Sequence, residues 1–259
     1  MSKSIVSVII PSYNMAGKIE RALESVLSQS YSSLEVIVVD DGSQDDTREK
    51  LKQFEKVVYC HQHNRGRASA LNRGINLAKG DYIAMLDADD TLPADSVLRR
   101  VTFLEQGFDA VFGDTNYIDA SGDLYHVRKP GFFRNPEELA WQFLGGLQSP
   151  FCAATVLYRK EPFLRCGLFD ETLRRSEDID LMMRLLKNCF VSYLPHAVYD
   201  YHVDTHSLWQ RLRHRKISFQ ERLRIIDKHF EGTERVELFL RTAAVECLKM
   251  GYEMVSQRR

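Results

Sequence analysis

One pattern of residues occurs three times in succession within the first 92 positions of the chain. Each unit has a short run of apolar, mostly β-branched residues, then a polar or glycine-containing turn, then a segment with apolar residues at helical spacing. The pattern predicts strands that begin near 5, 34, 57 and 82 and helices at 18–29, from 47 onward and at 68–78. Successive units of this kind favour an α/β fold with a mostly parallel sheet, whose ligands bind beyond the carboxyl ends of the strands.

The pattern becomes less regular after Pro93. Apolar spacing predicts a helix at 96–106, strands at 109–119 and 152–160, a helix at 176–187, mostly helix from 208 onward and a last helix at about 234–256. No linker rich in Pro, Gly or Ser separates these parts. We therefore expect the C-terminal helices to pack on the same body.

Composition excludes several classes of protein. The 35 Lys and Arg nearly balance the 36 Asp and Glu, so the net charge of -1 gives no support to nucleic-acid binding. The five cysteines contain no C-x-x-C pair, which argues against a disulfide framework or zinc cluster and favours a reducing, cytoplasmic setting. No apolar run approaches the roughly 20 residues of a membrane span, and no signal-peptide core is present. We expect a soluble protein, peripheral to a membrane at most.

An acidic turn follows the predicted strand at 82, where Asp87, Asp89 and Asp90 fall within four residues. Grouped carboxylates repel one another unless a cation or hydrogen-bond donors lie among them. A D-x-D pair offers the oxygen ligands that Mg²⁺ and Mn²⁺ share with substrate phosphates. The alternative interpretation is a solvated cap before a helix.

Two other acidic pairs lie at the ends of predicted elements. Asp40 could accept a hydrogen bond from a base imide or a sugar hydroxyl, whereas Asp41 fits a loop support or an Asx turn. Glu177 and Asp178 begin a predicted helix, where capping and the helix dipole account for one of them. A carboxylate aimed into the cleft would be a general base for a hydroxyl nucleophile, and we assign that role to Asp178.

Seven segments carry a resemblance to a known family: VSVIIPSYN, SVLSQSY, EVIVVDDGSQDDT, NRGRASALNRGI, GDYIAMLDADD, GLFDE and SEDIDLMMRL. In order and spacing, over about 4–187, they resemble the inverting glycosyltransferases of family 2. The resemblance implies a GT-A fold, Rossmann-like, with a central sheet flanked by helices. It implies a GT-A domain over 1–207, with a nucleotide-binding half at about 1–92 and an acceptor-binding half at about 93–207, and a C-terminal helical extension over 208–259.

The implied reaction transfers a sugar from a nucleotide diphosphate sugar, taken as a UDP-sugar, with inversion at the anomeric carbon. The acceptor would be a hydroxyl of a glycan, glycolipid or polymer in cell-surface polysaccharide synthesis. Carried over by motif, Pro11 and Tyr13 would line the nucleoside pocket, and Asp40 would contact the base. Asp87 would face the ribose, and Arg67 would contact the diphosphate or be one more exposed arginine at a helix start.

For the reacting groups, the resemblance implies Asp89 as a ligand of Mn²⁺ or Mg²⁺ and Asp178 as the base that deprotonates the acceptor. The chain departs from the family at 201–209, where it reads YHVDTHSLW and many relatives carry an Arg and a His. His202 and His206 could each reach the metal or the diphosphate, and we assign His202 to the metal. Both could equally be surface residues. Trp141 and the loop at 143–151 fit an acceptor pocket or core packing equally well.

Several alternatives stay open from the residues alone. The segment at 87–91 also satisfies the D-x-D-x-T of haloacid-dehalogenase-like phosphatases, with Asp87 as nucleophile and Asp89 as acid and base, although that motif usually begins a chain. A nucleotide-sugar-binding subunit without catalysis would bind donor and transfer nothing. The basic, amphipathic segment at 210–230 fits a helix peripheral to the inner face of the membrane or a solvated helix face. Donor sugar, acceptor, linkage and oligomeric state are not determined.

Overall fold

The apolar runs of the first 85 residues form four parallel strands in the order β3-β2-β1-β4, as the repeated pattern predicts. The computed structural model describes residues 4–130, 138, 144, 152–203, 208–235, 237–238, 240–242 and 244–245, with the backbone alone for 208–216. The strands are β1 (Val6–Ser12), β2 (Leu34–Asp40), β3 (Val57–His61), β4 (Tyr82–Met85), β5 (Ala110–Ile118), β6 (Leu124–Arg128), β7 (Val156–Arg159) and β8 (Val191–His202). The helices are α1 (Ile19–Leu27), α2 (Thr47–Leu51), α3 (Arg67–Leu77), α4 (Ser96–Leu104), α6 (Lys160–Arg165), α7 (Glu177–Asn188) and α8 (Leu208–His229), with a 3-10 turn η1 (Ala153–Thr155).

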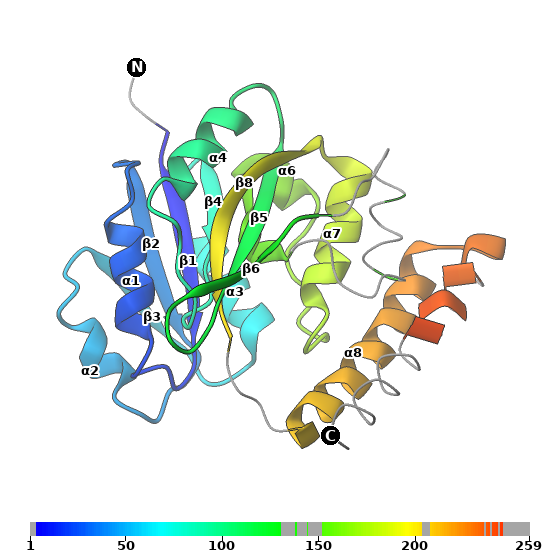
Figure 1. Ribbon diagram of the computed structural model, residues 1–259, viewed down its shortest axis with the longest axis horizontal. Coiled ribbons are helices and arrows are strands. Elements are labelled where there is room, and N and C mark those ends of the chain that lie inside the picture. Colours follow the sequence, from blue (N-terminus) through cyan, green and yellow to red (C-terminus); the bar gives the residue numbers. More distant parts are fainter. Residues whose placement is uncertain are drawn as a thin grey trace.

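The second half of the chain extends the same sheet beyond β4. β7 runs antiparallel to β4 and to β5, and β5 pairs antiparallel with β6 and parallel with β8. One mixed sheet therefore continues across the predicted boundary near residue 92, and helices flank it (Figure 1).

Helix α3 packs directly on β1 and β2. A Cβ atom at Gly74 would overlap the side chains of Ile9 and Val39, so glycine permits the close approach of helix and sheet. Helix α1 connects β1 to β2, in the direction of the β3 edge of the sheet. Helix α3 connects β3 to β4 in the opposite direction, because β4 lies on the other side of β1. Right-handed crossovers therefore place α1 and α3 on opposite faces of the sheet.

The carboxyl ends of β1, β2 and β4 meet at one edge, where the strand order reverses. The Ser12 carbonyl accepts a hydrogen bond from the Asp41 amide at 2.8 Å, and the Ile9 carbonyl accepts one from the Leu86 amide at 3.0 Å. Strand β1 includes Pro11 and extends one residue past it, to Ser12. Because β4 ends opposite Ile9, Pro11 lies beyond that ladder and its missing N–H costs no hydrogen bond to β4.

Three elements were not predicted: β6, α6 and β8. In β8, Leu194 pairs with Gly113 of β5, and the next pairing joins Ala197 to Asp114. Pro195 and His196 therefore form a bulge, which accommodates a proline inside a strand. A Cβ atom at Gly113 would meet the His196 carbonyl, so this glycine makes room for the bulge.

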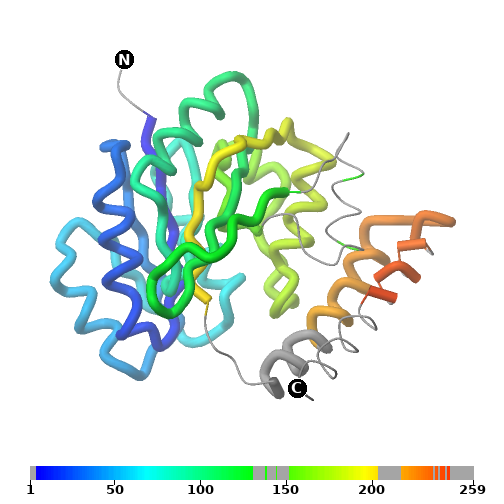
Figure 2. Tube along the Cα trace, viewed as in Figure 1, coloured from blue at the N-terminus to red at the C-terminus, as the bar shows by residue number. Residues whose placement is uncertain are grey.

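Helix α8 lies along the outside of α7, on the side away from β1 to β3 (Figures 1 and 2). Within the part of the chain that the structure describes, no helix is long and apolar enough to cross a membrane. His206, Trp141 and the loop at 143–151 lie outside the described residues, apart from Leu144, as does most of the predicted helix at 234–256.

Candidate active site

Arg67, the first residue of α3, joins two acidic motifs that are far apart in the sequence. Its Nε and Nη2 atoms donate to Asp87 Oδ1 at 2.9 and 2.8 Å, and its Nη1 donates to Glu177 Oε1 at 2.9 Å. Burial acts to lower the pKa of Arg67, but the charges of Asp87 and Glu177 raise it well above its ordinary value. This arginine therefore holds the acidic turn after β4 against the start of α7.

The glycine before Arg67 and Asp41, the residue after β2, fix the entry to α3. Gly66 has a φ of +94°, which glycine adopts at no steric cost. Asp41 accepts from the amides of Arg65 and Gly66, each at 2.8 Å, and from the Gln62 side chain. Asp41 thus supports a loop, one of its two predicted roles, and through that loop it positions Arg67.

Asp178 lies in the first turn of α7, half-buried, beside the buried Glu177. Its Oδ1 accepts a hydrogen bond from the Ile179 amide at 2.8 Å. Burial and the charge of Glu177 raise the pKa of Asp178 to about 6, although Arg67 and Arg222 act to lower it. A carboxyl group with this pKa is ionised at neutral pH and basic enough to take a proton from a positioned hydroxyl.

Capping and the helix dipole were expected to account for one of the two acids at the start of α7, and it is Asp178 rather than Glu177 that accepts from an amide of the first turn. Glu177 Oε1 binds Arg67, and Glu177 makes no capping hydrogen bond to the helix. The Oε2 atom is buried and has no hydrogen-bond partner among the described residues. An unpaired buried carboxylate oxygen is available to a hydroxyl hydrogen of a ligand.

Asp89 and His202, the two predicted metal ligands, line the same cavity of about 340 Å³. Lys18 and Arg21 of the first β-α unit line it too, and Lys18 Nζ lies 3.8 Å from Asp89 Oδ2. The His202 ring lies 3.0 Å from Thr91 Oγ1, and burial together with Arg21 and Lys18 lowers the pKa of His202. The imidazole is therefore neutral at pH 7, the form that binds metals.

The side chains that line this cavity suit a divalent cation bound by only two protein ligands. Across the described residues, no group of three or more His, Cys, Asp or Glu side chains is arranged to hold a metal ion. One carboxylate and one neutral imidazole fit a divalent cation whose remaining ligands come from phosphate oxygens and water. The lysine and arginine on the same wall fit the negative charge of a diphosphate.

Asp90, the third acid of the turn, has a structural role. It is buried and accepts hydrogen bonds from the Tyr199 hydroxyl at 2.7 Å and the His202 amide at 2.8 Å. Burial and the charge of Asp87 raise the pKa of Asp90 to about 8. Asp90 thereby ties the acidic turn to β8 and places the His202 backbone beside Asp89.

The predicted nucleoside-binding residues lie at the ends of β1 and β2. Tyr13 is 43% exposed just beyond β1, and Pro11 is next to last in that strand. Asp40 is buried and accepts from the Ser43 amide at 2.8 Å and the Tyr59 hydroxyl at 2.7 Å. In the structure Asp40 organises its own turn, and its contact with a nucleotide base stays a prediction.

Sequence reasoning missed Lys18, Arg21 and Tyr199 as members of the site. Lys18 and Arg21 lie at the start of α1, which follows the SYN loop after β1. Because ligands were expected beyond the carboxyl end of that strand, the sequence position of these two residues could have predicted a place in the site. Tyr199 had no such signal because β8 itself was not predicted.

Residues 7–167, more than half of the chain, match the model of the family described as Glycosyl transferase family 2. The chain belongs to glycosyltransferase family 2. An uncharacterised glycosyltransferase of Rickettsia typhi is 33% identical over 198 residues, which are 75% of this chain and 62% of the relative. TuaG of Bacillus subtilis, named for teichuronic acid biosynthesis, is 34% identical over 198 residues, 74% of this chain and 75% of TuaG. The family 2 chain thus spans less than two thirds of the length of the Rickettsia relative.

Two solved structures show the same fold as this family 2 chain. TarS 1–349 of Staphylococcus aureus in complex with UDP-GlcNAc has a TM-score of 0.69 at 18% identity, over 93% of this chain and 72% of TarS 1–349. The mannosyltransferase PcManGT of Pyrobaculum calidifontis, in complex with GDP-Man and Mn²⁺, has a TM-score of 0.67 at 21% identity. The match covers 93% of this chain and 69% of the PcManGT chain. The predicted GT-A fold is confirmed, and the family match removes the phosphatase interpretation of the acidic turn.

Proposed function

We propose that this protein transfers a sugar from a nucleotide diphosphate sugar to an acceptor hydroxyl, with inversion at the anomeric carbon. The observation that carries the proposal is the double ion pair of Arg67, which brings Asp178 and Glu177 to the acidic turn at the nucleotide-binding edge. Family membership supports a transferase, and the titles of two structural neighbours name nucleotide sugars as their ligands.

In this proposal Asp178 is the general base. Its carboxylate accepts the proton of the acceptor hydroxyl as that oxygen attacks the anomeric carbon from the face opposite the leaving diphosphate. A direct displacement inverts the centre, so no protein nucleophile is required. The unpaired Oε2 of Glu177 accepts a hydrogen bond from a sugar hydroxyl and so orients the donor sugar beside the base.

The nucleotide half of the donor lies along the ends of β1, β2 and β4. Pro11 and Tyr13 line the nucleoside, Asp40 contacts the base and Asp87 the ribose. Arg67, Lys18 and Arg21 stabilise the negative charge of the diphosphate. Asp89 and His202 would hold a divalent cation, Mn²⁺ or Mg²⁺, which when bound stabilises charge on the leaving diphosphate.

We propose that aromatic rings on β5 and β8 contact a saccharide acceptor. Tyr117 of β5 and Tyr201 of β8 have ring centroids 5.1 Å apart, and Tyr201 is 41% exposed. Tyr201 lies two residues from Tyr199, which binds Asp90, so both side chains share one face of β8. We propose a glycan, glycolipid or polymer acceptor of cell-surface polysaccharide synthesis, with the protein cytoplasmic and peripheral at the membrane's inner face.

The deciding experiment measures donor use and product stereochemistry together. Purified protein is incubated with UDP-sugars and GDP-Man with and without Mn²⁺, with saccharide acceptors, and release of the nucleoside diphosphate is followed. We expect metal-dependent release with one nucleotide class and a product of inverted anomeric configuration by NMR. Donor binding without release across these acceptors would favour a binding subunit, and a retained configuration would reject Asp178 as base.

A further inference from the structure

Helix α8 contacts both α7, which bears Asp178, and the loop that precedes α7. This helix lies outside the part of the chain that matches the family model, which ends at residue 167. Figures 1 and 2 show α8 running beside α7 on the side away from β1 to β3. Two groups of these contacts bear on the start of α7, one made by Ser218 and Glu221 and the other by Lys228 and His229.

The first group holds the residues just before α7. Glu221 of α8 is buried, at 4% exposure, and its two carboxylate oxygens accept from the amides of Arg174 and Arg175 at 2.7 and 2.9 Å. Ser218, one turn earlier in α8, lies 3.2 Å by its hydroxyl from that of Ser176, the N-cap residue of α7. The next residues of the chain are Glu177 and Asp178.

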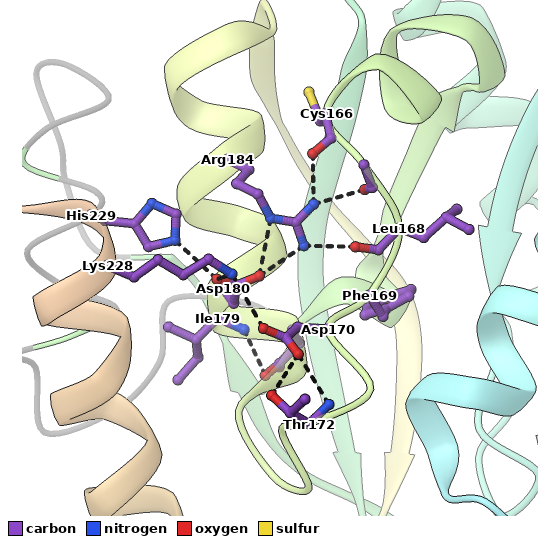
Figure 3. A network of polar contacts seen from close by, with 12 residues as sticks. Cys166, Leu168, Phe169, Asp170, Thr172, Ile179, Asp180, Arg184, Lys228 and His229 are labelled. Atoms are coloured by element: carbon purple, nitrogen blue, oxygen red, sulfur yellow. Dashed lines mark hydrogen bonds and ion pairs between the residues drawn. The ribbon is translucent and has the colours of Figure 1, made fainter.

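The second group of contacts joins α8 to Asp180, in the first turn of α7. Asp180 is fully buried, and its Oδ1 lies 2.8 Å from Lys228 Nζ and 2.9 Å from His229 Nε2 (Figure 3). Its Oδ2 accepts from Arg184 at 2.8 Å. Figure 3 shows Lys228 and His229 reaching from α8 toward Asp180 on α7, so this group joins the two helices two residues after Asp178 in the chain.

A carboxylate that accepts two consecutive backbone amides fixes the direction of the chain more tightly than one side-chain contact does. Charge-assisted hydrogen bonds of this kind are short and strong, and at this burial water does not compete with them. Because the peptide planes at Arg174 and Arg175 are held, the entry direction of α7 is held, and with it the side chain of Asp178 three residues later. A general base displaced by about 1 Å can lose roughly 100-fold in rate.

We propose that Glu221 is a positioning residue for the general base Asp178, so that α8 sets the geometry of a reaction that takes place on α7. The proposal rests on the proposed function, in which Asp178 removes the acceptor proton. Glu221 acts through the backbone amides of 174–175 and touches neither donor nor acceptor.

The test compares Glu221→Gln with Asp227→Asn in the full chain. Both remove one carboxylate charge from α8, but Asp227 is exposed and pairs only with Arg235 in the described contacts. Gln has nearly the same size as Glu, but one of its two oxygen acceptors is replaced by an NH₂ group. That group faces a backbone N–H donor, so one of the two hydrogen bonds from the amides of 174–175 is lost. We expect kcat to fall about 10- to 100-fold in Glu221→Gln with the donor KM within about twofold of wild type. Asp227→Asn should keep wild-type kcat and KM.

Amide hydrogen exchange supplies a readout that does not depend on turnover. Exchange at Arg174 and Arg175 should be faster in Glu221→Gln than in wild type and unchanged in Asp227→Asn. A milder variant, Ser218→Ala, keeps the test available if Glu221→Gln fails to fold, and it should lower kcat by a smaller factor at unchanged KM. Circular dichroism checks the fold of each variant.

The outcomes separate the two proposals. Faster exchange at 174–175 with unchanged kcat would overturn the positioning role while leaving the proposed function in place, and a rise in KM alone would do the same. Wild-type protein that transfers no sugar from any donor would overturn the proposed function, and the positioning proposal with it.

Discussion

At the scale of single residues, the three acids after β4 have different partners and therefore different chemistry. Asp87 is paired with Arg67, Asp89 lines a cavity with His202, and Asp90 accepts from Tyr199 and the backbone of β8. Arg67 offsets the charge of Asp87, whereas burial and the charge of Asp87 still raise the pKa of Asp90 to about 8. Mutations at these positions should accordingly have different effects.

Asp89→Ala and Asp178→Asn should separate binding from chemistry. Asp89→Ala should weaken nucleotide binding only in the presence of Mn²⁺, because the proposed ion loses a ligand. Asp178→Asn should bind the donor nearly as wild type does and lose transfer by about 100-fold or more, because its amide accepts no proton. Isothermal titration and single-turnover rates measure the two effects, and wild-type turnover in Asp178→Asn would show that another group is the base.

The transfer rate should depend on the ionisation of Asp178. Its pKa is raised to about 6, so the base is ionised and active above that pH and becomes protonated and inactive as the pH falls through it. A profile of kcat between pH 4.5 and 8 should show an acidic limb with a midpoint near 6. A midpoint near 4, the ordinary value for an aspartate, would contradict the burial of this group in the working enzyme.

Arg67→Met should move that limb toward higher pH, because the charge of Arg67 is one of the groups that lower the pKa of Asp178. Glu177, which acts in the opposite direction, loses its partner in the same variant. Arg65→Met is the matched control, since Arg65 is exposed and pairs with Glu171. An unshifted limb in folded Arg67→Met would mean that its charge does not reach the base.

At the scale of elements, α7 depends on buried ion pairs for its place. Arg184 donates to Asp180 and to the carbonyls of Cys166, Gly167 and Leu168, and so fastens α7 to the loop that precedes it (Figure 3). Burial acts to raise the pKa of Asp180, but hydrogen bonds from His229 and Lys228 and the charge of Arg184 hold it well below its ordinary value. The ionised form of Asp180 is therefore the one that stabilises the fold.

Asp180→Asn should lower the free energy of unfolding at pH 7 by about 3 kcal/mol, since it removes the buried carboxylate charge that pairs with Arg184 and Lys228. Urea denaturation measures the loss, with Asp227→Asn as an exposed control on α8. The difference in unfolding free energy between wild type and variant should shrink as the pH falls below about 4. A carboxyl group whose pKa is lowered by folding stabilises the protein at pH values above its pKa in the unfolded chain. That stabilisation is lost as the pH falls toward its pKa in the folded protein. A difference that does not change between pH 7 and pH 3 would contradict this assignment.

The elements that follow a simple period were predictable, and those that depend on distant partners were not. The strands β1 to β4 and the helices α3 and α7 have apolar residues at strand or helical spacing, so their places follow from the sequence. β8 does not, because Pro195 and His196 interrupt its alternation, and it is a strand only because β5 pairs with it on both sides of the bulge. β6 has exposed residues along most of its length and so lacks an apolar signal.

At the scale of the whole molecule, the site is assembled from both halves of the chain. The acids at the ends of β2 and β4 were predictable because parallel strands bring their carboxyl ends to one edge. The partners of these acids were not predictable from the sequence. The contact between Arg67 and Glu177, for example, joins residues 110 positions apart, and no spacing pattern in the sequence indicates it. The division at residue 92 and the helical extension from 208 stay predictions, while the sheet itself is continuous across the first of these boundaries.

Ligand binding to the whole protein should be visible as a rise in melting temperature. A nucleotide that binds only the native state raises the melting temperature, and it does so more when it binds more tightly. The nucleotides to compare are UDP, GDP, dTDP and CMP, each with and without Mn²⁺. We expect a shift of a few degrees with one nucleotide, larger with Mn²⁺ and reduced in Asp89→Ala. A shift of equal size with and without Mn²⁺ would argue against the metal site at Asp89 and His202.

The backbone contact of Glu221 also bears on how the protein is made. Ribosomes produce a chain from the N-terminus, so the nucleotide-binding edge and the segment with Asp178 emerge well before Glu221 does. On the proposed function, a nascent chain that has folded β1 to β4 already holds the residues proposed to bind the nucleotide, while the entry to α7 is still unsupported. On our proposal, such a chain transfers sugar more slowly than the finished protein until α8 has left the ribosome and Glu221 supports the entry to α7.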